Sequence, residues 1–146
     1  MANFKPKYSS ECISVERMHQ VCNNLHIVLL EVLGNATCKA MYGWSCDLHI
    51  ELLWKPMQVP QSMMESFIRD SISQRIFLPG KSDLIIESPD EKLTLNLNHE
   101  SDIHVDGSDD ELIKKFVTHD SFNDIKFYSR KELQEKYPDR FGDSVE

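Results

Sequence analysis

An unbroken alternation of apolar and polar residues from Leu93 to Asp106 is the feature that most constrains the fold. A two-residue period places the two sets of side chains on opposite faces of a β-strand. The run is more than twice as long as a usual strand of about 5–6 residues. We therefore expect two consecutive strands with a bend near residues 99–101, whose apolar faces meet the same core.

Helices are expected in four stretches, because apolar residues recur there with the 3.6-residue period of an amphipathic helix or follow a capping pattern. In the first stretch, Ser14 precedes the apolar positions and Gly34 follows them, as start and stop signals do. In each of the others, a serine stands three residues before a glutamate. The four predicted helices cover residues 15–33, about 62–76, about 108–118 and about 129–137.

Further strands are predicted from shorter patterns. Trp44–Trp54 alternates like a half-buried strand, and residues 84–86 pair with residues 93–97 as a hairpin around Pro89, while residues 125–128 form a last strand. The sequence thus predicts an α+β fold with a mixed or antiparallel sheet of about four to five strands and helices packed mainly on one face. We expect one globular domain over residues 1–146, with flexible tails at 1–10 and 140–146.

The composition favours a cytoplasmic protein. No apolar run approaches the roughly 18 residues of a membrane span, and no apolar stretch follows Lys5 and Lys7 as it would in a signal peptide. The four cysteines form no CxxC pair, so we expect reduced thiols. No membrane partner is predicted.

Acidic residues are concentrated in one part of the chain. Residues 83–111 hold ten acids and one base, Lys92, so this segment carries −9 while the whole chain carries −8. Such a segment repels phosphate backbones, which disfavours nucleic acid as a partner. Gly80-Lys81-Ser82 resembles the end of a phosphate loop, but Arg75 stands where that motif needs glycine, so no cofactor is predicted.

Local structure accounts for some of these charges. Asp90 and Glu91 belong to the predicted turn, and residues 109–111 favour the start of a helix by complementing its dipole. Asp102, His104 and Asp106 remain, together with Glu100, on one face of one predicted strand. Two of these side chains are close enough to share a metal, but a catalytic centre generally needs three protein ligands, so a solvated polar face or a charged protein-binding face are the alternatives.

The function that we expect from the sequence is non-catalytic. An acidic binding module without a catalytic motif fits an immunity protein or antitoxin that neutralises a basic, nuclease-like toxin, because charge accelerates association with a basic cleft. The alternatives are a metal-dependent hydrolase, in which His104 acts with Asp102 or Asp106 and with His49, and a structural or adaptor protein. The residues expected to bind the partner are Glu100, Asp102, His104, Asp106, Asp109, Tyr128 and Trp44, the last two as aromatic anchors.

Overall fold

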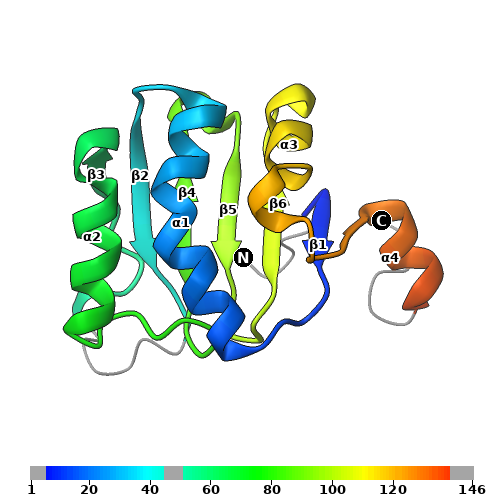
Figure 1. The fold of residues 1–146 in the computed structure, drawn as a ribbon, viewed down its shortest axis with the longest axis horizontal. Coiled ribbons are helices and arrows are strands. Elements are labelled where there is room, and N and C mark those ends of the chain that lie inside the picture. Colours follow the sequence, from blue (N-terminus) through cyan, green and yellow to red (C-terminus); the bar gives the residue numbers. More distant parts are fainter. Residues whose placement is uncertain (1–5, 45–50, 139–146) are drawn as a thin grey trace.

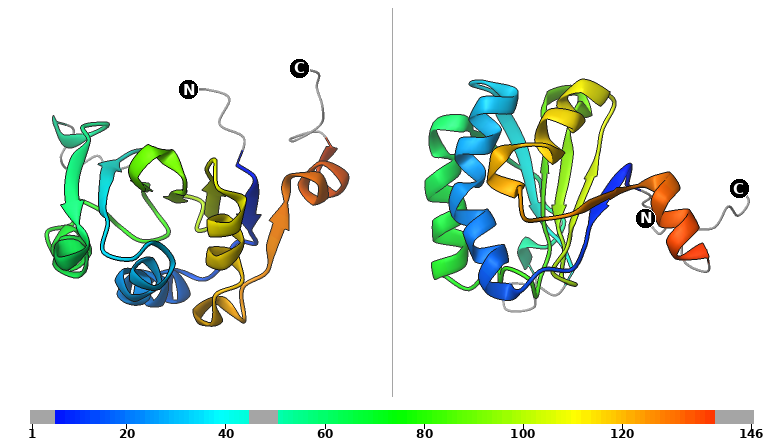
Figure 2. Two further views of the ribbon diagram at one scale, coloured as in Figure 1. Left: turned by 90° about the horizontal axis from the view of Figure 1, so that it is seen from above. Right: turned by 45° about the vertical axis from the view of Figure 1, so that its right-hand side comes forward.

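The computed structural model describes residues 6–44 and 51–138, which form one α+β domain built on an antiparallel sheet. Seven strands occur in the order β3-β2-β4-β5-β6-β1-β7, more than the four to five expected. Helices α1, α2 and α3 cover one face of this sheet (Figures 1 and 2). In chain order the elements are β1 (Tyr8–Ser10), α1 (Val15–Leu33), β2 (Thr37–Tyr42), β3 (Met57–Pro60), α2 (Gln61–Ser73), β4 (Leu84–Glu87), the 3₁₀ turn η2 (Pro89–Glu91), β5 (Thr94–Leu97), β6 (Ile103–Asp106), α3 (Asp110–Val117), the 3₁₀ turn η3 (Asp120–Phe122), β7 (Phe127–Ser129) and α4 (Arg130–Lys136).

The long alternating run forms the predicted pair of strands, β5 and β6. They pair antiparallel, with Asn96 opposite His104, and they meet at a turn in which the Asn98 amide donates to the Asp102 carbonyl at 2.9 Å. The apolar positions of both strands are buried against the helices, and the polar positions face the other way. The predicted hairpin of β4 and β5 around Pro89 is also confirmed.

The four predicted helices are present, but two begin differently from the expectation. The Ser14 hydroxyl caps α1 and the Ser129–Glu132 capping box starts α4, as predicted. In contrast, α2 begins directly after the extended residue Pro60 without a side-chain cap, so Ser62 already lies inside its first turn. At α3, the capping carboxylate comes from Asp109, one residue after the expected Ser108.

The strand predicted over Trp44–Trp54 is wrong for its described part. Trp44 and Trp54 lie in turns, and Leu53 makes only an isolated parallel bridge to Tyr42, while residues 45–50 lie outside the described residues. The strand in this part of the chain is instead β2, which ends before Gly43. Its inward residues include the small Cys38 and Ala40, so its alternation carried a weak apolar signal.

Three residues of the predicted N-terminal tail form β1, which lies inside the sheet between β6 and β7. Ser9 and Ser10 are buried there, and the Ser10 hydroxyl accepts a hydrogen bond from the Ile103 amide at 2.8 Å. Because β1 is short and polar, its pairing depends on these tertiary contacts rather than on a local pattern. Residues 1–5 and 139–146, which include the predicted C-terminal tail, lie outside the described residues.

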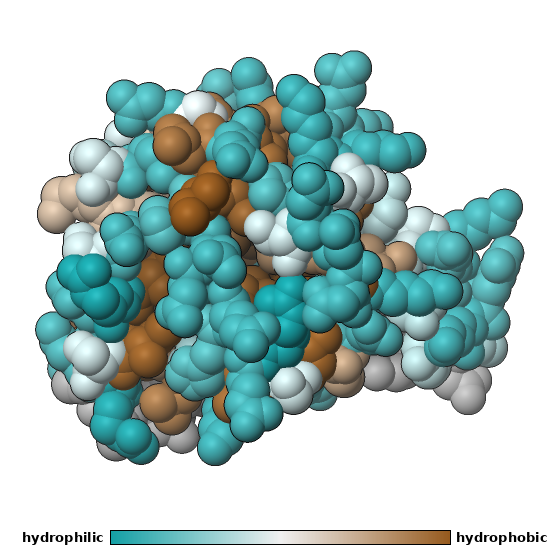
Figure 3. All heavy atoms as spheres, viewed as in Figure 1, coloured by the Kyte–Doolittle hydropathy of each residue, from teal (hydrophilic) through white to brown (hydrophobic). Residues whose placement is uncertain are grey.

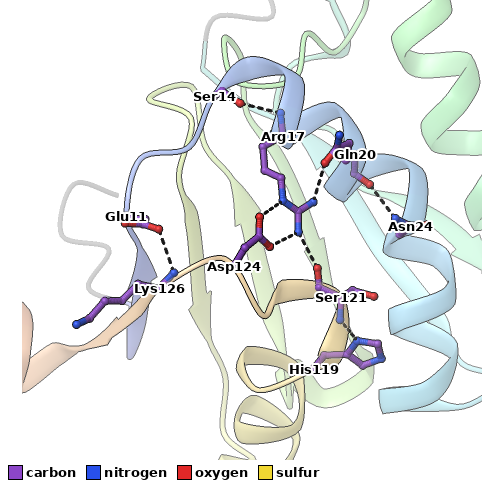
Figure 4. A network of polar contacts seen from close by, with 9 residues as sticks. All are labelled: Glu11, Ser14, Arg17, Gln20, Asn24, His119, Ser121, Asp124 and Lys126. Atoms are coloured by element: carbon purple, nitrogen blue, oxygen red, sulfur yellow. Dashed lines mark hydrogen bonds and ion pairs between the residues drawn. The ribbon is translucent and has the colours of Figure 1, made fainter.

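A charged network fastens the segment between α3 and β7 to helix α1 (Figure 4). The Arg17 guanidinium donates to both carboxylate oxygens of Asp124, at 2.8 and 2.9 Å, and to the Ser121 carbonyl at 2.7 Å. His119 accepts from the Ser121 amide through Nδ1, so its Nε2 carries the proton that it donates to Glu31. This network positions the last strand of the sheet.

The helix side of the molecule shows apolar side chains interrupted by hydrophilic ones (Figure 3). Within residues 6–44 and 51–138, no helix combines the length and the apolar character that crossing a bilayer requires.

Candidate functional site

The candidate site lies on the face of the sheet opposite α1, α2 and α3, which we call the open face (Figure 2). Strand pairing aligns one side chain from each of six strands in a row across it, because paired residues point to the same side. The members of this central row, in order from β7 to β2, are Tyr128, Ser9, His104, Asn96, Ile85 and Met41.

Acidic side chains lie around the middle of the open face. Asp106 is opposite Thr94, which is opposite Glu87, so this second row runs parallel to the central one. Lys39 follows opposite Glu87, with its Nζ 3.9 Å from the Glu87 carboxylate. With Asp102 just before β6, this part of the open face contributes the acids Glu87, Asp102 and Asp106 and the base Lys39. We call Glu87, Asp102, His104 and Asp106 the acidic face.

Asp102 and His104 form the centre of the acidic face. The Asp102 Oδ2 atom lies 3.1 Å from His104 Nε2, and the two side chains are 13% and 19% exposed. An ionised carboxylate can only accept, so Nε2 carries a proton. Asn96 Oδ1 and Asp102 Oδ1 are both buried, and neither has a hydrogen-bond donor among the described residues. The sheet therefore presents two acceptors in need of a donor.

A buried carboxylate fixes the turn beside this centre. Asp83 Oδ1 accepts from the His99 amide at 2.7 Å and from His99 Nδ1 at 2.8 Å, and the Asp83 side chain is 2% exposed. His99 immediately follows Asn98, whose amide donates to the Asp102 carbonyl. Asp83 thus stabilises the turn between β5 and β6. Its buried Oδ1 atom already accepts hydrogen bonds from within the chain.

An exposed pair of tryptophans lies at the same end of the sheet. The Asp83 amide donates to the Trp44 carbonyl at 3.0 Å, which places Trp44 next to the β5–β6 turn. Its ring packs edge-on against Trp54, with ring centroids 5.8 Å apart, and the two side chains are 64% and 43% exposed. Large aromatic surface is thus available near the acidic face.

The structure separates some of the residues that the sequence grouped. Asp102 precedes β6 and Asp109 follows it, so they lie at opposite ends of the strand, where Asp109 caps α3 by accepting from two backbone amides. Tyr128 belongs to the central row, but Lys126 and Lys136 lie 5.3 and 5.0 Å from its ring centroid. Tyr128 therefore marks a basic end of the open face.

Glu100 is exposed in the turn between β5 and β6, where its amide donates to the Asn98 side chain at 3.0 Å. Glu100 is two residues before Asp102 in the sequence and does not belong to β6. Asp102 and His104 are in contact, Glu100 lies in the turn before them with Trp44 beside that turn, and Asp106 lies at the far end of β6 on the same face.

The described residues do not bring the candidates together as a metal centre. Residues 6–44 and 51–138 contain no group of three His, Cys, Asp or Glu side chains placed to hold a metal ion, and His49 lies outside these ranges. Burial raises the pKa of Cys22 to about 12 and also raises the pKa of Cys38, so both thiols stay protonated. The buried atoms Asn96 Oδ1 and Asp102 Oδ1 can accept hydrogen bonds from a cationic group.

No protein-family model, no curated protein and no solved structure matches this chain. The reasoning on its function therefore depends on its own residues.

Sequence reasoning expected Trp44 at this site but missed its partner Trp54, the Asp83–His99 contact and Asn96. Asn96 had a usable signal, since it occupies a polar position of the same alternation as His104. The Asp83–His99 contact and the Trp44–Trp54 pair join residues that are distant in the sequence. No pattern within one stretch of the sequence therefore predicts them.

Proposed function

We propose that this chain is a non-catalytic protein that binds a basic protein partner through its acidic face. The observation that carries the proposal is the pair of buried acceptors, Asn96 Oδ1 and Asp102 Oδ1, which lack a donor among the described residues. An unsatisfied buried acceptor costs about 1–3 kcal/mol. A lysine or arginine side chain of a partner would satisfy such acceptors and would neutralise the carboxylate as well.

The charges around this centre support a basic partner. Glu87, Asp102 and Asp106 lie around His104, and Lys39 is paired opposite Glu87, while Lys126 and Lys136 lie at the Tyr128 end of the open face. Charge of one sign on a binding surface raises the association rate with an oppositely charged partner, up to about 10⁸–10⁹ M⁻¹s⁻¹ at low salt.

Trp44 and Trp54 supply the apolar part of the proposed interface. Tryptophan is enriched among the few residues that carry most of the binding energy at interfaces. Both rings are exposed, and they lie at the end of the sheet that holds Asp102. Tyr128 is not part of this interface, because two lysines already contact its ring.

The class of partner that we propose is a cytotoxic enzyme with a basic cleft, such as a nuclease, so that the chain would be a cytoplasmic immunity protein or antitoxin. A chain of 146 residues with a net charge of −8 has the size and charge for this role. Fast capture of the toxin is the benefit that the acidic face would provide.

A survival assay tests this proposal. The toxic domain encoded beside the gene of this chain is expressed together with the wild type, with Asp102→Asn/Asp106→Asn, or with Glu65→Gln/Asp70→Asn as a control that loses the same charge on exposed positions of α2. We expect survival with the wild type and the control, and reduced survival with the first double variant. Absence of a toxic neighbour, or no protection by the wild type, contradicts the immunity function; equal protection by all three contradicts the assigned surface.

A further inference from the structure

A second feature of the molecule is a basic pocket at the opposite end of the sheet from Trp44. A cavity of about 460 Å³ lies between β1, α3 and the start of α4. Lys7, Lys114, Arg130 and Lys131 line it, together with one acid, Asp110. A concentration of positive charge in a chain of net charge −8 calls for an explanation.

Pairing within the chain compensates only part of this charge. Lys7 Nζ lies 3.0 Å from the Asp110 carboxylate, and Arg130 Nε donates to the Pro6 carbonyl at 3.3 Å. In the described part of the chain, Lys114 and Lys131 have no ion pair with an acidic side chain. The pocket therefore keeps a net positive charge after its own aspartate is counted.

Helix stability explains the position of Lys114 but not the positions of Arg130 and Lys131. Lys114 is in the last turn of α3, where the dipole favours a cation. Arg130 and Lys131, however, are the first two residues of α4, a position where the dipole opposes positive charge. Arg130 gains its hydrogen bond to the Pro6 carbonyl, whereas Lys131 has no ion pair with an acidic side chain in the described part of the chain. A local rule broken without a structural gain, as at Lys131, is expected mainly at functional sites.

We propose that this pocket binds a small phosphate-bearing anion. Arginine presents a planar fork that matches phosphate oxygens, and lysine supplies mobile point charges. A phosphate dianion compensates two or more cations at once, which a single carboxylate does not. The volume lies within the about 300–1,000 Å³ of ligand pockets, and Tyr8, Ile113 and Ser129 complete the lining, with the Tyr8 ring as apolar surface for the organic part of such a molecule.

This site is separate from the acidic face and does not depend on the proposed function. Tyr8 pairs with Val105, whose side chain is buried in the core on the helix side of the sheet, whereas His104 faces the other way. Its ligand side chains come from Lys7, just before β1, and from α3 and α4, and α4 lies to one side of the rest of the molecule (Figure 1).

Calorimetric titration with inorganic pyrophosphate at constant ionic strength tests the proposal. We expect saturable binding by the wild type that is weakened about tenfold or more in Lys114→Gln/Lys131→Gln, because this variant loses two charge-assisted contacts to the anion. Lys55→Gln/Lys92→Gln removes the same charge from exposed positions outside the pocket and should bind like the wild type. Thermal melts of each variant confirm that it is folded.

Three outcomes would overturn the proposal. They are no saturable binding by the wild type, an equal loss in both double variants, and tighter binding of citrate than of pyrophosphate. The last would identify the pocket as one for carboxylates instead.

Discussion

His104 Nε2 donates a hydrogen bond to Asp102 Oδ2 across 3.1 Å, on the face of the sheet that α1, α2 and α3 leave uncovered. The two residues are two apart on an extended chain and therefore point to the same side. The contact orients the Asp102 carboxylate and leaves its Oδ1 atom as a buried acceptor without a donor among the described residues. This arrangement connects the fold to the proposed binding of a cation.

Asp109 is expected to stabilise the fold without contributing to the interface. Its carboxylate accepts from the amides of Glu111 and Leu112 at the start of α3, so Asp109→Ala should lower the free energy of unfolding by about 1 kcal/mol in a urea titration. Ser108→Ala serves as the control, because Ser108 is exposed and is not the capping residue. An equal loss from both changes would show that the cap is not the cause.

The ion pair of Arg17 and Asp124 should make stability depend on acid pH. The hydrogen bond from Arg17 holds the pKa of Asp124 below its ordinary value of 3.8. A lowered pKa in the folded state adds stability above the ordinary value, and this stability is lost as the pH falls through the lowered value. Asp124→Asn should therefore be less stable than the wild type at about pH 6, and the difference should shrink below about pH 3.

Asp120→Asn is the matched control, since it removes another exposed carboxylate from the same segment. Urea unfolding at several pH values measures both. A constant difference between Asp124→Asn and the wild type at all pH values would contradict the role given to the ion pair.

The buried thiols should make the protein less stable at alkaline pH. Burial raises the pKa of Cys22 from 9.0 to about 12, so the unfolded thiol loses its proton at a lower pH than the folded one. The resulting stability is fully present below pH 9.0 and is lost as the pH rises toward about 12, by about 1 kcal/mol per unit. Replacing Cys22 by alanine should flatten this slope.

Thiol labelling gives a second measurement. At about pH 8 the exposed Cys12 should react fast, while Cys22 and Cys38 should react only as the protein opens. A Cys46→Ser background removes the thiol that lies outside the described residues. Labelling of Cys22 at the rate of Cys12 in the folded protein would contradict its burial.

Elements with a complete local signal could be predicted from the sequence. The apolar period of α1, the alternation of β5 and β6 and the turn at Pro89 each lie within one continuous stretch. β1 could not be predicted, because Ser9 and Ser10 are buried by pairing with β6 and β7, which follow about a hundred residues later. The strand expected at Trp44 is wrong because large aromatic residues dominated the pattern, whereas Cys38 and Ala40, two of the inner residues of β2, are small.

The candidate site was predictable only as far as one strand reaches. Alternation placed Asp102, His104 and Asp106 on one face, and the structure agrees. The charge count could not separate Asp109, which is used as a helix cap, from the carboxylates on the open face. Nor could it show that lysines contact Tyr128, since Lys136 and Tyr128 meet only after α4 has packed beside β7.

The most direct test of the account is a two-dimensional NMR titration of the ¹⁵N-labelled protein with a short arginine-rich peptide at low salt. The account predicts saturable shifts that are largest at Asn96, Asp102 and His104 and at the Trp44 indole. These shifts should be lost in Asp102→Asn/Asp106→Asn and kept in Glu65→Gln/Asp70→Asn. Shifts centred on residues 109–111, or spread evenly over all exposed acids, would contradict it.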